Sequence, residues 1–370
     1  MIRVLSVFGT RPEAIKMAPV VRALQRVPDR FESHVCVTAQ HRTMLDQVLE
    51  VFELKADIDL DLMVPGQSPA SIAAGVLDHL PPLLRRLQPD IVLVQGDTTT
   101  SFAAAFAAFQ ERMPTGHVEA GLRTGDRWQP FPEEMNRVLT TRIAALHFAP
   151  TPAARDALLR EGIAAGDIYL TGNTVIDALL QTVRADYHFR TPALAGLDPA
   201  RRVVLVTTHR RESFGAPLRS ICAAIRTLAA RFPELQFVLP VHPNPEVKGT
   251  VEALLCDLPG MRLIPPVDYL EFVHLMSRAD LVLTDSGGIQ EEAPSLGKPV
   301  LVLREVTERP EGVAAGTALV VGTDQERIVA AASELLTSPE TYARMANAVN
   351  PYGDGRASER IVAALADRFA

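Results

Sequence analysis

Short apolar runs recur along the chain, and most of them are followed by a small or polar turn and then by a stretch with helical spacing. An apolar run of about four to eight residues that ends at such a turn is typical of a buried strand, whereas apolar residues spaced three and four apart predict a helix. The predicted strands include Ile2–Phe8, His34–Thr38, Ile91–Val94, Val203–Thr207, Phe237–Val241, Asp280–Leu283 and Val300–Leu303. Strands that alternate with helices predict parallel sheets and an α/β fold.

Prolines modify two of the predicted helices. Ile72–Leu87 has helical spacing, and we expect Pro81 and Pro82 to interrupt it, because proline removes a backbone donor. For the same reason we expect the helix that contains Pro294 to be short or kinked.

Two further segments have distinct patterns. The pattern of Glu359–Phe369 predicts a short amphipathic helix, and the weak periodicity of residues 182–201 predicts a linker.

Acidic side chains follow successive strands of the first half. Asp97 follows Ile91–Val94 after Gln95 and Gly96, Glu119 lies in a repeat of the same pattern, and Glu133 and Glu134 follow a proline-stiffened loop at a helix start. Because ligands of an open parallel sheet bind outside the carboxyl ends of its strands, we expect these carboxylates to converge on one rim. Asp97 also suits a helix N-cap, so a catalytic and a capping role both remain open for it.

Cationic residues stand at two other strand ends. Arg11 and Lys16 follow the first strand and its glycine, where they either bind an anion or are ordinary surface cations. His209, with Arg210 and Arg211, follows Val203–Thr207 and predicts either a phosphate or leaving-group site or a surface turn.

The stretch Thr284–Glu292 combines a strand end, small residues and a helix start. Glycines there let a phosphate approach backbone N–H groups that the helix leaves unpaired, which predicts a diphosphate site. Glu291 and Glu292 offer carboxylates to a ribose or a sugar hydroxyl, and further along the chain Arg304 and Arg309 supply positive charge. The alternative is a plain strand-to-helix turn with a solvated acidic helix face.

Length and composition narrow the class of protein. A chain of 370 residues suits two domains, and 47% hydrophobic with 22% charged residues is typical of a folded globular protein. The net charge of −7 gives no support for nucleic-acid binding. No apolar run approaches the roughly 20 residues of a membrane span, and the N-terminus resembles a first strand, not a signal peptide, so we expect no membrane partner and a cytoplasmic location.

Several common sites are excluded by their missing motifs. The three cysteines, Cys36, Cys222 and Cys256, are widely spaced and predict neither a disulfide framework nor a zinc site. The chain has no G-x-G-x-x-G, no G-x-x-x-x-G-K-[ST] and no H-E-x-x-H, which argues against a dinucleotide site, a P-loop and a zincin. The residues around Ser286 lack the first glycine of a hydrolase elbow.

Six segments together resemble the non-hydrolysing UDP-N-acetylglucosamine 2-epimerases of bacteria, and the similarity runs along nearly the whole chain. They are Gly9–Lys16, Gln95–Thr98, His117–Arg123, Phe131–Glu134, Thr208–Glu212 and Thr284–Glu292. The resemblance implies two Rossmann-like α/β domains of the glycosyltransferase-B type that face a cleft. It places an N-terminal domain with most catalytic residues at 1–180, a UDP-binding domain at 181–355, and at 356–370 a C-terminal helix that could pack back on the first domain.

The resemblance also assigns residues to roles. It implies catalytic roles for Asp97, Glu119, Glu133 and His209, and substrate binding by Arg11, Lys16, Phe272, Ser286, Gly287, Gly288, Glu292 and Arg309. Some members of the family bind a second substrate molecule as an activator, and the matching allosteric positions here are Gln40, Glu134, Arg210 and His242. Thr43 and Gln67 depart from that pattern, which weakens the expectation of regulation.

The activity that the resemblance implies is reversible epimerisation at C2 of UDP-N-acetylglucosamine to UDP-N-acetylmannosamine. It would proceed by elimination of UDP to a glycal and re-addition, in a homodimer without metal or redox cofactor, and would supply a precursor for cell-surface polysaccharide. A glycosyltransferase of the same fold, a hydrolysing relative and a protein that only binds a nucleotide sugar are the alternatives.

Overall fold

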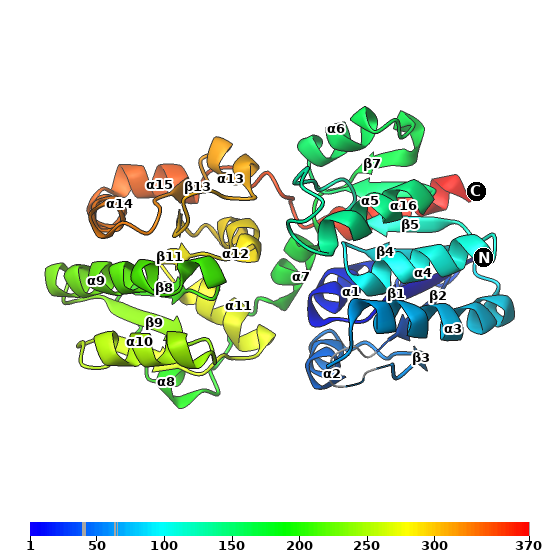
Figure 1. Cartoon of the computed structure of the whole chain (residues 1–370). Coiled ribbons are helices and arrows are strands. Elements are labelled where there is room, and N and C mark those ends of the chain that lie inside the picture. The colour runs from blue at the N-terminus through cyan, green and yellow to red at the C-terminus, as the bar shows by residue number, and fades with distance from the viewer. Residues whose placement is uncertain (39–41, 63, 65, 370) are drawn as a thin grey trace. The chain divides into compact units, whose positions relative to one another are not determined.

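A computed structural model describes residues 1–38, 42–62, 64 and 66–369 of the chain. The chain forms two compact units (Figure 1). The first comprises Met1–Gln181 and Tyr352–Ala370, and the second comprises Thr182–Pro351. Each unit is an α/β layer structure around its own parallel sheet, which confirms the predicted fold class of two Rossmann-like domains.

The first unit contains a parallel sheet of seven strands within the described residues, in the order β3-β2-β1-β4-β5-β6-β7. The strands are β1 (Ile2–Phe8), β2 (Phe31–Val37), β3 (Ile58–Asp59), β4 (Ile91–Gln95), β5 (Thr115–Val118), β6 (Leu146–Ala149) and β7 (Ile168–Leu170). Because β1 pairs with both β2 and β4, the strand order reverses there. In open α/β sheets such a reversal marks the rim at which ligands bind.

Helices cover both faces of this sheet. They are α1 (Arg11–Gln25), α2 (Arg42–Val51), α3 (Pro69–Leu87), α4 (Thr99–Gln110), α5 (Glu133–Ile143), α6 (Pro152–Arg160), the short η1 (Ala165–Asp167), α7 (Thr174–Thr182) and α16 (Ala357–Arg368). The final helix, α16, packs on α1. Its start is held by the buried carboxylate of Asp177, which accepts the N–H groups of Ala357 and Ser358 at 3.1 and 2.7 Å.

Pro81 and Pro82 do not interrupt α3, so that expectation was wrong. The helix runs unbroken through both prolines. Its buried residues Ile72, Val76, Leu80, Leu83 and Leu84 lie on one face against the sheet. Burial of a side chain of this size is worth about 1.5–3 kcal/mol, so a few together offset the roughly 3 kcal/mol that an interior proline costs a helix.

The second unit contains a parallel sheet of six strands in the order β10-β9-β8-β11-β12-β13, all of whose residues are described. The strands are β8 (Val203–Thr207), β9 (Gln236–Pro240), β10 (Met261–Ile264), β11 (Leu281–Thr284), β12 (Val300–Val302) and β13 (Ala318–Val320). Its helices are α8 (Pro192–Ala195), η2 (Arg211–Ser213), α9 (Ala216–Arg231), α10 (Pro245–Leu255), α11 (Tyr269–Arg278), α12 (Gly287–Glu292), η3 (Ala293–Leu296), α13 (Pro310–Ala314), α14 (Gln325–Thr337) and α15 (Pro339–Ala346).

Residues 182–201, which were predicted to form a linker, belong to the second unit and contact its helix α11. The ring of Tyr187 stacks on His274 of α11 with centroids 3.8 Å apart. The carboxylate of Glu271, on the same helix, accepts the N–H groups of Arg190 and Thr191. Weak periodicity reflects an irregular backbone here, and the aromatic side chains anchor that backbone to the second unit.

The helix after Thr284 is short, as Pro294 predicts. The α-helical hydrogen bonding of α12 ends at Glu292, and the chain continues as the 3-10 turn η3, which contains the proline. Among all helices of the described chain, none is long and apolar enough to cross a membrane.

Candidate active site

Glu119 lies directly after β5, and three side chains hold its carboxylate. Its backbone adopts a left-handed φ of 63°, which is uncommon for a residue with a side chain. Lys16 Nζ lies 2.6 Å from each of its carboxylate oxygens. Asn173 Nδ2 donates to Oε1 at 2.9 Å, and Gln95 Nε2 donates to Oε2. One ammonium and two amides thus fix a carboxylate that is only 5% exposed.

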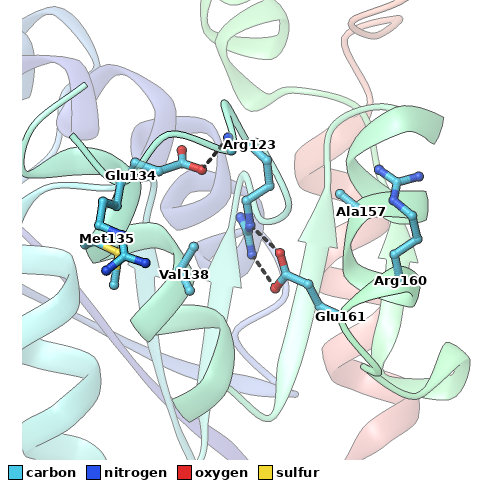
Figure 2. Close-up of a pocket in the computed structure, with 9 residues that line it drawn as sticks. Arg123, Glu134, Met135, Val138, Ala157, Arg160 and Glu161 are labelled. Atoms are coloured by element: carbon cyan, nitrogen blue, oxygen red, sulfur yellow. Dashed lines mark hydrogen bonds and ion pairs between the residues drawn. The ribbon is translucent and has the colours of Figure 1, made fainter. Parts of the chain in front are cut away.

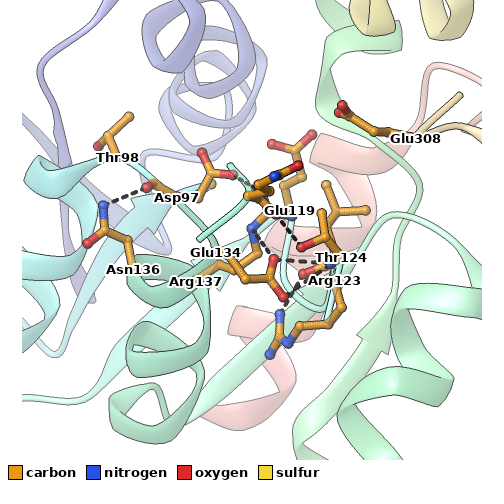
Figure 3. Close-up of polar contacts among 12 residues, drawn as sticks. Asp97, Thr98, Glu119, Arg123, Thr124, Glu134, Asn136, Arg137 and Glu308 are labelled. Carbon is orange, nitrogen blue, oxygen red and sulfur yellow. Dashed lines mark hydrogen bonds and ion pairs between the residues drawn. The ribbon is translucent and has the colours of Figure 1, made fainter. Parts of the chain in front are cut away.

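Asp97 lies beside Glu119, after the neighbouring strand β4. Gly96 turns the chain with a φ of 68°, and Thr98 caps α4 by accepting the N–H of Ser101. Asp97 is therefore not the N-cap, and that alternative is removed. Its carboxylate pairs with Arg137 Nη2 at 2.8 Å (Figure 3). Burial raises the pKa of Asp97, and the positive charge of Arg137 opposes part of that rise.

The start of α1 is tied to the Asp97 turn through Glu13. Glu13 is 1% exposed and closes a capping box with Thr10. Its other carboxylate oxygen accepts the hydroxyl of Thr98 at 2.6 Å. Burial raises the pKa of Glu13. Through these contacts Glu13 sets the position of the helix that carries Arg11 and Lys16, both of which are half-buried.

The start of α5 brings two more acids to this unit's rim. Glu134 is buried, and its carboxylate accepts the N–H groups of Thr124 and Gly125 at 3.0–3.1 Å (Figure 3). Arg137 Nε lies 3.5 Å from the same carboxylate, so Arg137 connects Glu134 to Asp97. Glu133 is half-buried and adds negative charge near Asp97, which acts to raise the pKa of Asp97.

An open pocket of about 510 Å³ lies next to this loop (Figure 2). Its lining residues are Arg123, Gly125, Arg127, Glu134, Met135, Val138, Ala157, Arg160 and Glu161. Arg123 forms two parallel bonds to Glu161, at 2.7 and 3.0 Å, and this ion pair lies in the wall between α5 and α6. The pocket does not contain Asp97 or Glu119.

In the second unit, His209 and Asp285 form the central polar pair. Asp285 is completely buried, and it accepts the N–H groups of His209 and Arg210 and the hydroxyl of Ser213. His209 Nδ1 lies 3.1 Å from Asp285 Oδ1. Burial acts to raise the pKa of Asp285, but the hydrogen bonds from His209 and Arg210 outweigh it, so the pKa lies below its ordinary value.

Two arginines lie beside the first residues of α12. A Cβ added to Gly287 would lie 3.8 Å from the guanidinium groups of both Arg210 and Arg309. Arg309 also donates to the buried carboxylate of Glu291. Ser286, Gly288 and Glu292 lie on the same short turn, and Gly288 is exposed. The predicted residues Ser286, Gly287, Gly288 and Arg309 therefore come together at one end of this sheet.

The remaining residues predicted to bind substrate or activator are Phe272, His242 and Gln40. Phe272 is half-buried on α11, and His242 follows β9, where its Nδ1 accepts the N–H of Asn244 at 3.2 Å. Gln40 lies outside the described residues. No group of three His, Cys, Asp or Glu side chains in the described chain could hold a metal ion.

Sequence reasoning missed three residues that contact Asp97 or Glu119, namely Gln95, Arg137 and Asn173, and it missed Asp285, which contacts His209. Gln95 and Asp285 each end a predicted strand or begin the turn after it, so their positions contained a signal. Asn173 and Arg137 follow from no motif, because their contacts depend on which helices flank β5.

Comparisons with known proteins concern the chain as a whole. A family model described as UDP-N-acetylglucosamine 2-epimerase matches residues 22–366. The UDP-N-acetylglucosamine 2-epimerase of Yersinia pestis is 55% identical over 371 residues, which cover 98% of each chain. The crystal structure of the Neisseria meningitidis UDP-GlcNAc 2-epimerase bound to UDP-GlcNAc is 48% identical, covers 99% of this chain and 100% of its own, and has a TM-score of 0.87. A glycosyltransferase of kitacinnamycin, 14% identical over 100% of this chain and 97% of its own with a TM-score of 0.63, shares the fold alone.

Proposed function

The chain belongs to the UDP-N-acetylglucosamine 2-epimerase family, and we propose that it interconverts UDP-N-acetylglucosamine and UDP-N-acetylmannosamine through elimination and re-addition of UDP. The observation that supports this route is the pair of acids Asp97 and Glu119 at the ends of the adjacent strands β4 and β5. The Glu119 side chain is 5% exposed and that of Asp97 is 33% exposed, and their partners differ, as two groups with different proton-transfer tasks require.

The chemistry explains the need for such a pair. The proton on C2 is not next to a carbonyl, so a carboxylate alone removes it poorly. When the C1–O bond to UDP breaks, the bond electrons leave with UDP and positive charge develops at C1. Loss of the C2 proton to a carboxylate then gives a glycal and UDP. Return of a proton to the opposite face of C2, with bonding of a UDP oxygen to C1, completes the inversion.

We assign proton transfer around C2 to Asp97, Glu119 and Glu133, with Arg11 and Lys16 near the reacting sugar. The diphosphate would be bound by Ser286, Gly287, Gly288 and Arg309, whose N–H groups and positive charge stabilise a leaving anion. Glu292 would contact the ribose, Phe272 would pack on uracil, and His209 would act beside the leaving group.

Three further features belong to the same proposal. The protein would act as a cytoplasmic homodimer and supply a precursor for cell-surface polysaccharide. Substrate activation through Gln40, Glu134, Arg210 and His242 would give sigmoidal kinetics, whereas hyperbolic kinetics in both directions would contradict it.

The test is incubation of the purified protein with UDP-N-acetylglucosamine in deuterated water, followed by NMR. Deuterium at C2 together with both UDP-sugars supports the proposal. Free N-acetylmannosamine and UDP would show a hydrolase, and no change without an added acceptor would show a transferase or a binding protein.

Variants test the residue roles in the same assay. Asp97→Asn, Glu119→Gln and His209→Ala are each expected to lower turnover by about 10²-fold or more, the size of one acid–base or electrostatic contribution. A fully active Glu119→Gln would refute its assignment.

A further inference from the structure

Asn173 has its side-chain orientation fixed from both ends. It is 2% exposed and lies immediately before α7. Its Oδ1 accepts the N–H of Val175 at 3.1 Å, and only an amide oxygen can accept that bond. The NH₂ group is therefore the end that faces Glu119, and Nδ2 donates to Glu119 Oε1 at 2.9 Å. Its backbone N–H donates to the carbonyl of Tyr352 at 2.7 Å, which holds the residue in place.

Gln95 serves the other oxygen of the same carboxylate. It is the last residue of β4 and is 3% exposed, and its Nε2 donates to Glu119 Oε2. The two amides thus bind one oxygen each, while Lys16 Nζ reaches both. Lys16 alone could follow the carboxylate as it turns, because an ammonium on a flexible stem accepts many geometries. The amides remove that freedom.

We propose that Asn173, together with Gln95, is a positioning residue for proton transfer by Glu119: it fixes the plane of the Glu119 carboxylate and stabilises its ionised form. The inference rests on the proposed proton-transfer role of Glu119. Neutral amide donors favour a carboxylate over a carboxylic acid, because they donate to the charged form and accept nothing from it. They do so without adding a second positive charge beside the developing cation at C1.

The test replaces the Asn173 amide by a carboxyl group of the same shape. Asn173→Asp places a second carboxylate against Glu119 Oε1, where like charges raise the pKa of one of the two groups. When that group is protonated, its O–H forms a hydrogen bond between residue 173 and Glu119. The variant pair therefore has a hydrogen-bond donor only while it holds this single proton, whereas the wild-type amide donates at every pH. The ratio of Asn173→Asp turnover to wild-type turnover should therefore change with pH, rising as pH falls by up to about tenfold per pH unit, the limit for one proton.

Gln236→Glu is the matched control. Gln236 is a 2% exposed amide of the second unit, and its side chain exchanges two hydrogen bonds with the backbone of Asp198: Oε1 accepts the N–H and Nε2 donates to the carbonyl. The same amide-to-acid change there should give a turnover ratio that does not rise with falling pH. Asn173→Ala, in turn, should lower kcat by about tenfold or more, with KM changed less than about threefold, because it acts on the chemical step and not on binding.

The rate of deuterium entry at C2 measures the proton-transfer step directly. A purely structural role of Asn173 would not make this rate depend on pH in the Asn173→Asp variant. A flat Asn173→Asp ratio between pH 6 and 8.5, or an Asn173→Ala variant with wild-type kcat, would overturn the inference. If Asn173→Asp does not fold, Gln95→Glu makes the same test at the other oxygen. Full deuterium entry in Glu119→Gln would instead refute the proposed function of Glu119, so the two failures are distinguishable.

Discussion

The Nδ1 atom of His209 lies 3.1 Å from Oδ1 of Asp285, a carboxylate with no exposed surface. The two residues follow β8 and β11, which are paired in register from Leu281 to Thr284. An Nδ1–H that donates to Asp285 leaves Nε2 as the free ring nitrogen, and the His209 side chain is 43% exposed. Asp285 thus selects the tautomer that the candidate leaving-group histidine presents.

Asp285→Asn should lower kcat/KM by about 10–10²-fold, because an amide NH₂ facing Nδ1 favours the opposite tautomer. It should also destabilise the second unit by about 1.5–3 kcal/mol, the worth of a hydrogen bond to a charged acceptor. Steady-state kinetics and urea unfolding measure the two effects. Asp257→Asn, at an exposed residue paired with Arg226, is the control and should change neither. Wild-type kinetics in Asp285→Asn would contradict the tautomer assignment.

Arg137→Met should move one limb of the kcat–pH profile to higher pH. Burial raises the pKa of Asp97 and Arg137 lowers it, so removal of the guanidinium raises that pKa further. Activity that needs ionised Asp97 then falls at neutral pH and recovers at higher pH, whereas activity that needs the protonated form extends to higher pH. Arg137→Lys retains the charge and should shift the limb less. A limb that stays in place in Arg137→Met would show that Asp97 does not titrate in catalysis.

His117 should make the protein sensitive to mild acid. It is completely buried with Nε2 at 2.7 Å from the carbonyl of Gly96, and burial lowers its pKa from 6.5 to about 3. Below pH 6.5 His117 is protonated in the unfolded chain but stays neutral in the folded chain. The free energy of unfolding therefore falls as pH falls, by up to about 1.4 kcal/mol per pH unit, until about pH 3.

His117→Gln removes that titration and keeps a donor for Gly96, so its unfolding free energy should fall less steeply from pH 6.5 to 5. Urea titrations at several pH values measure the slope. Buried His147, whose pKa is lowered to about 4, gives a second variant with the same sign. Parallel slopes for wild type and His117→Gln would contradict the prediction.

Gly121 is expected to tolerate no side chain. Its φ is 93°, and an added Cβ would lie 2.3 Å from the carbonyl oxygen of Ala154. Gly125, four residues later, has a φ of 81° but nothing within 4 Å of an added Cβ. Gly125→Ala should therefore cost only the left-handed backbone penalty of about 1–2 kcal/mol, and Gly121→Ala clearly more. Thermal unfolding of the two variants measures their losses of stability. Equal losses in Gly121→Ala and Gly125→Ala would contradict the predicted clash with Ala154.

The sequence was sufficient to predict the residues that follow strands. Asp97, His209 and Ser286 each come shortly after an apolar run, and a parallel sheet brings such positions to one edge whatever the strand order. Glu119 follows Thr115–Val118, which is not an apolar run, and only the repeat of the strand-and-turn pattern indicated its position. Pattern alone could not predict partners between distant segments. Asn173 and Glu119 are 54 residues apart, and His209 and Asp285 are 76 apart, so their contacts depend on which strands are neighbours.

Predictions from single residues failed where packing outweighed local preference. Pro81 and Pro82 remain inside α3 because the apolar face of that helix is buried. Thr98, not Asp97, caps α4, although both residue types suit the position.

The first unit is built from two separated parts of the chain, and α16 packs on α1 only after the whole second unit has been passed. During translation, residues 1–181 leave the ribosome long before residues 352–369, so the Tyr352 carbonyl that holds Asn173 and the helix that Asp177 caps are both absent at first. The acid cluster around Glu119 is therefore completed late in synthesis. A nascent chain stalled after the second unit would contain every predicted catalytic side chain but would lack the segment that fixes Asn173 beside Glu119.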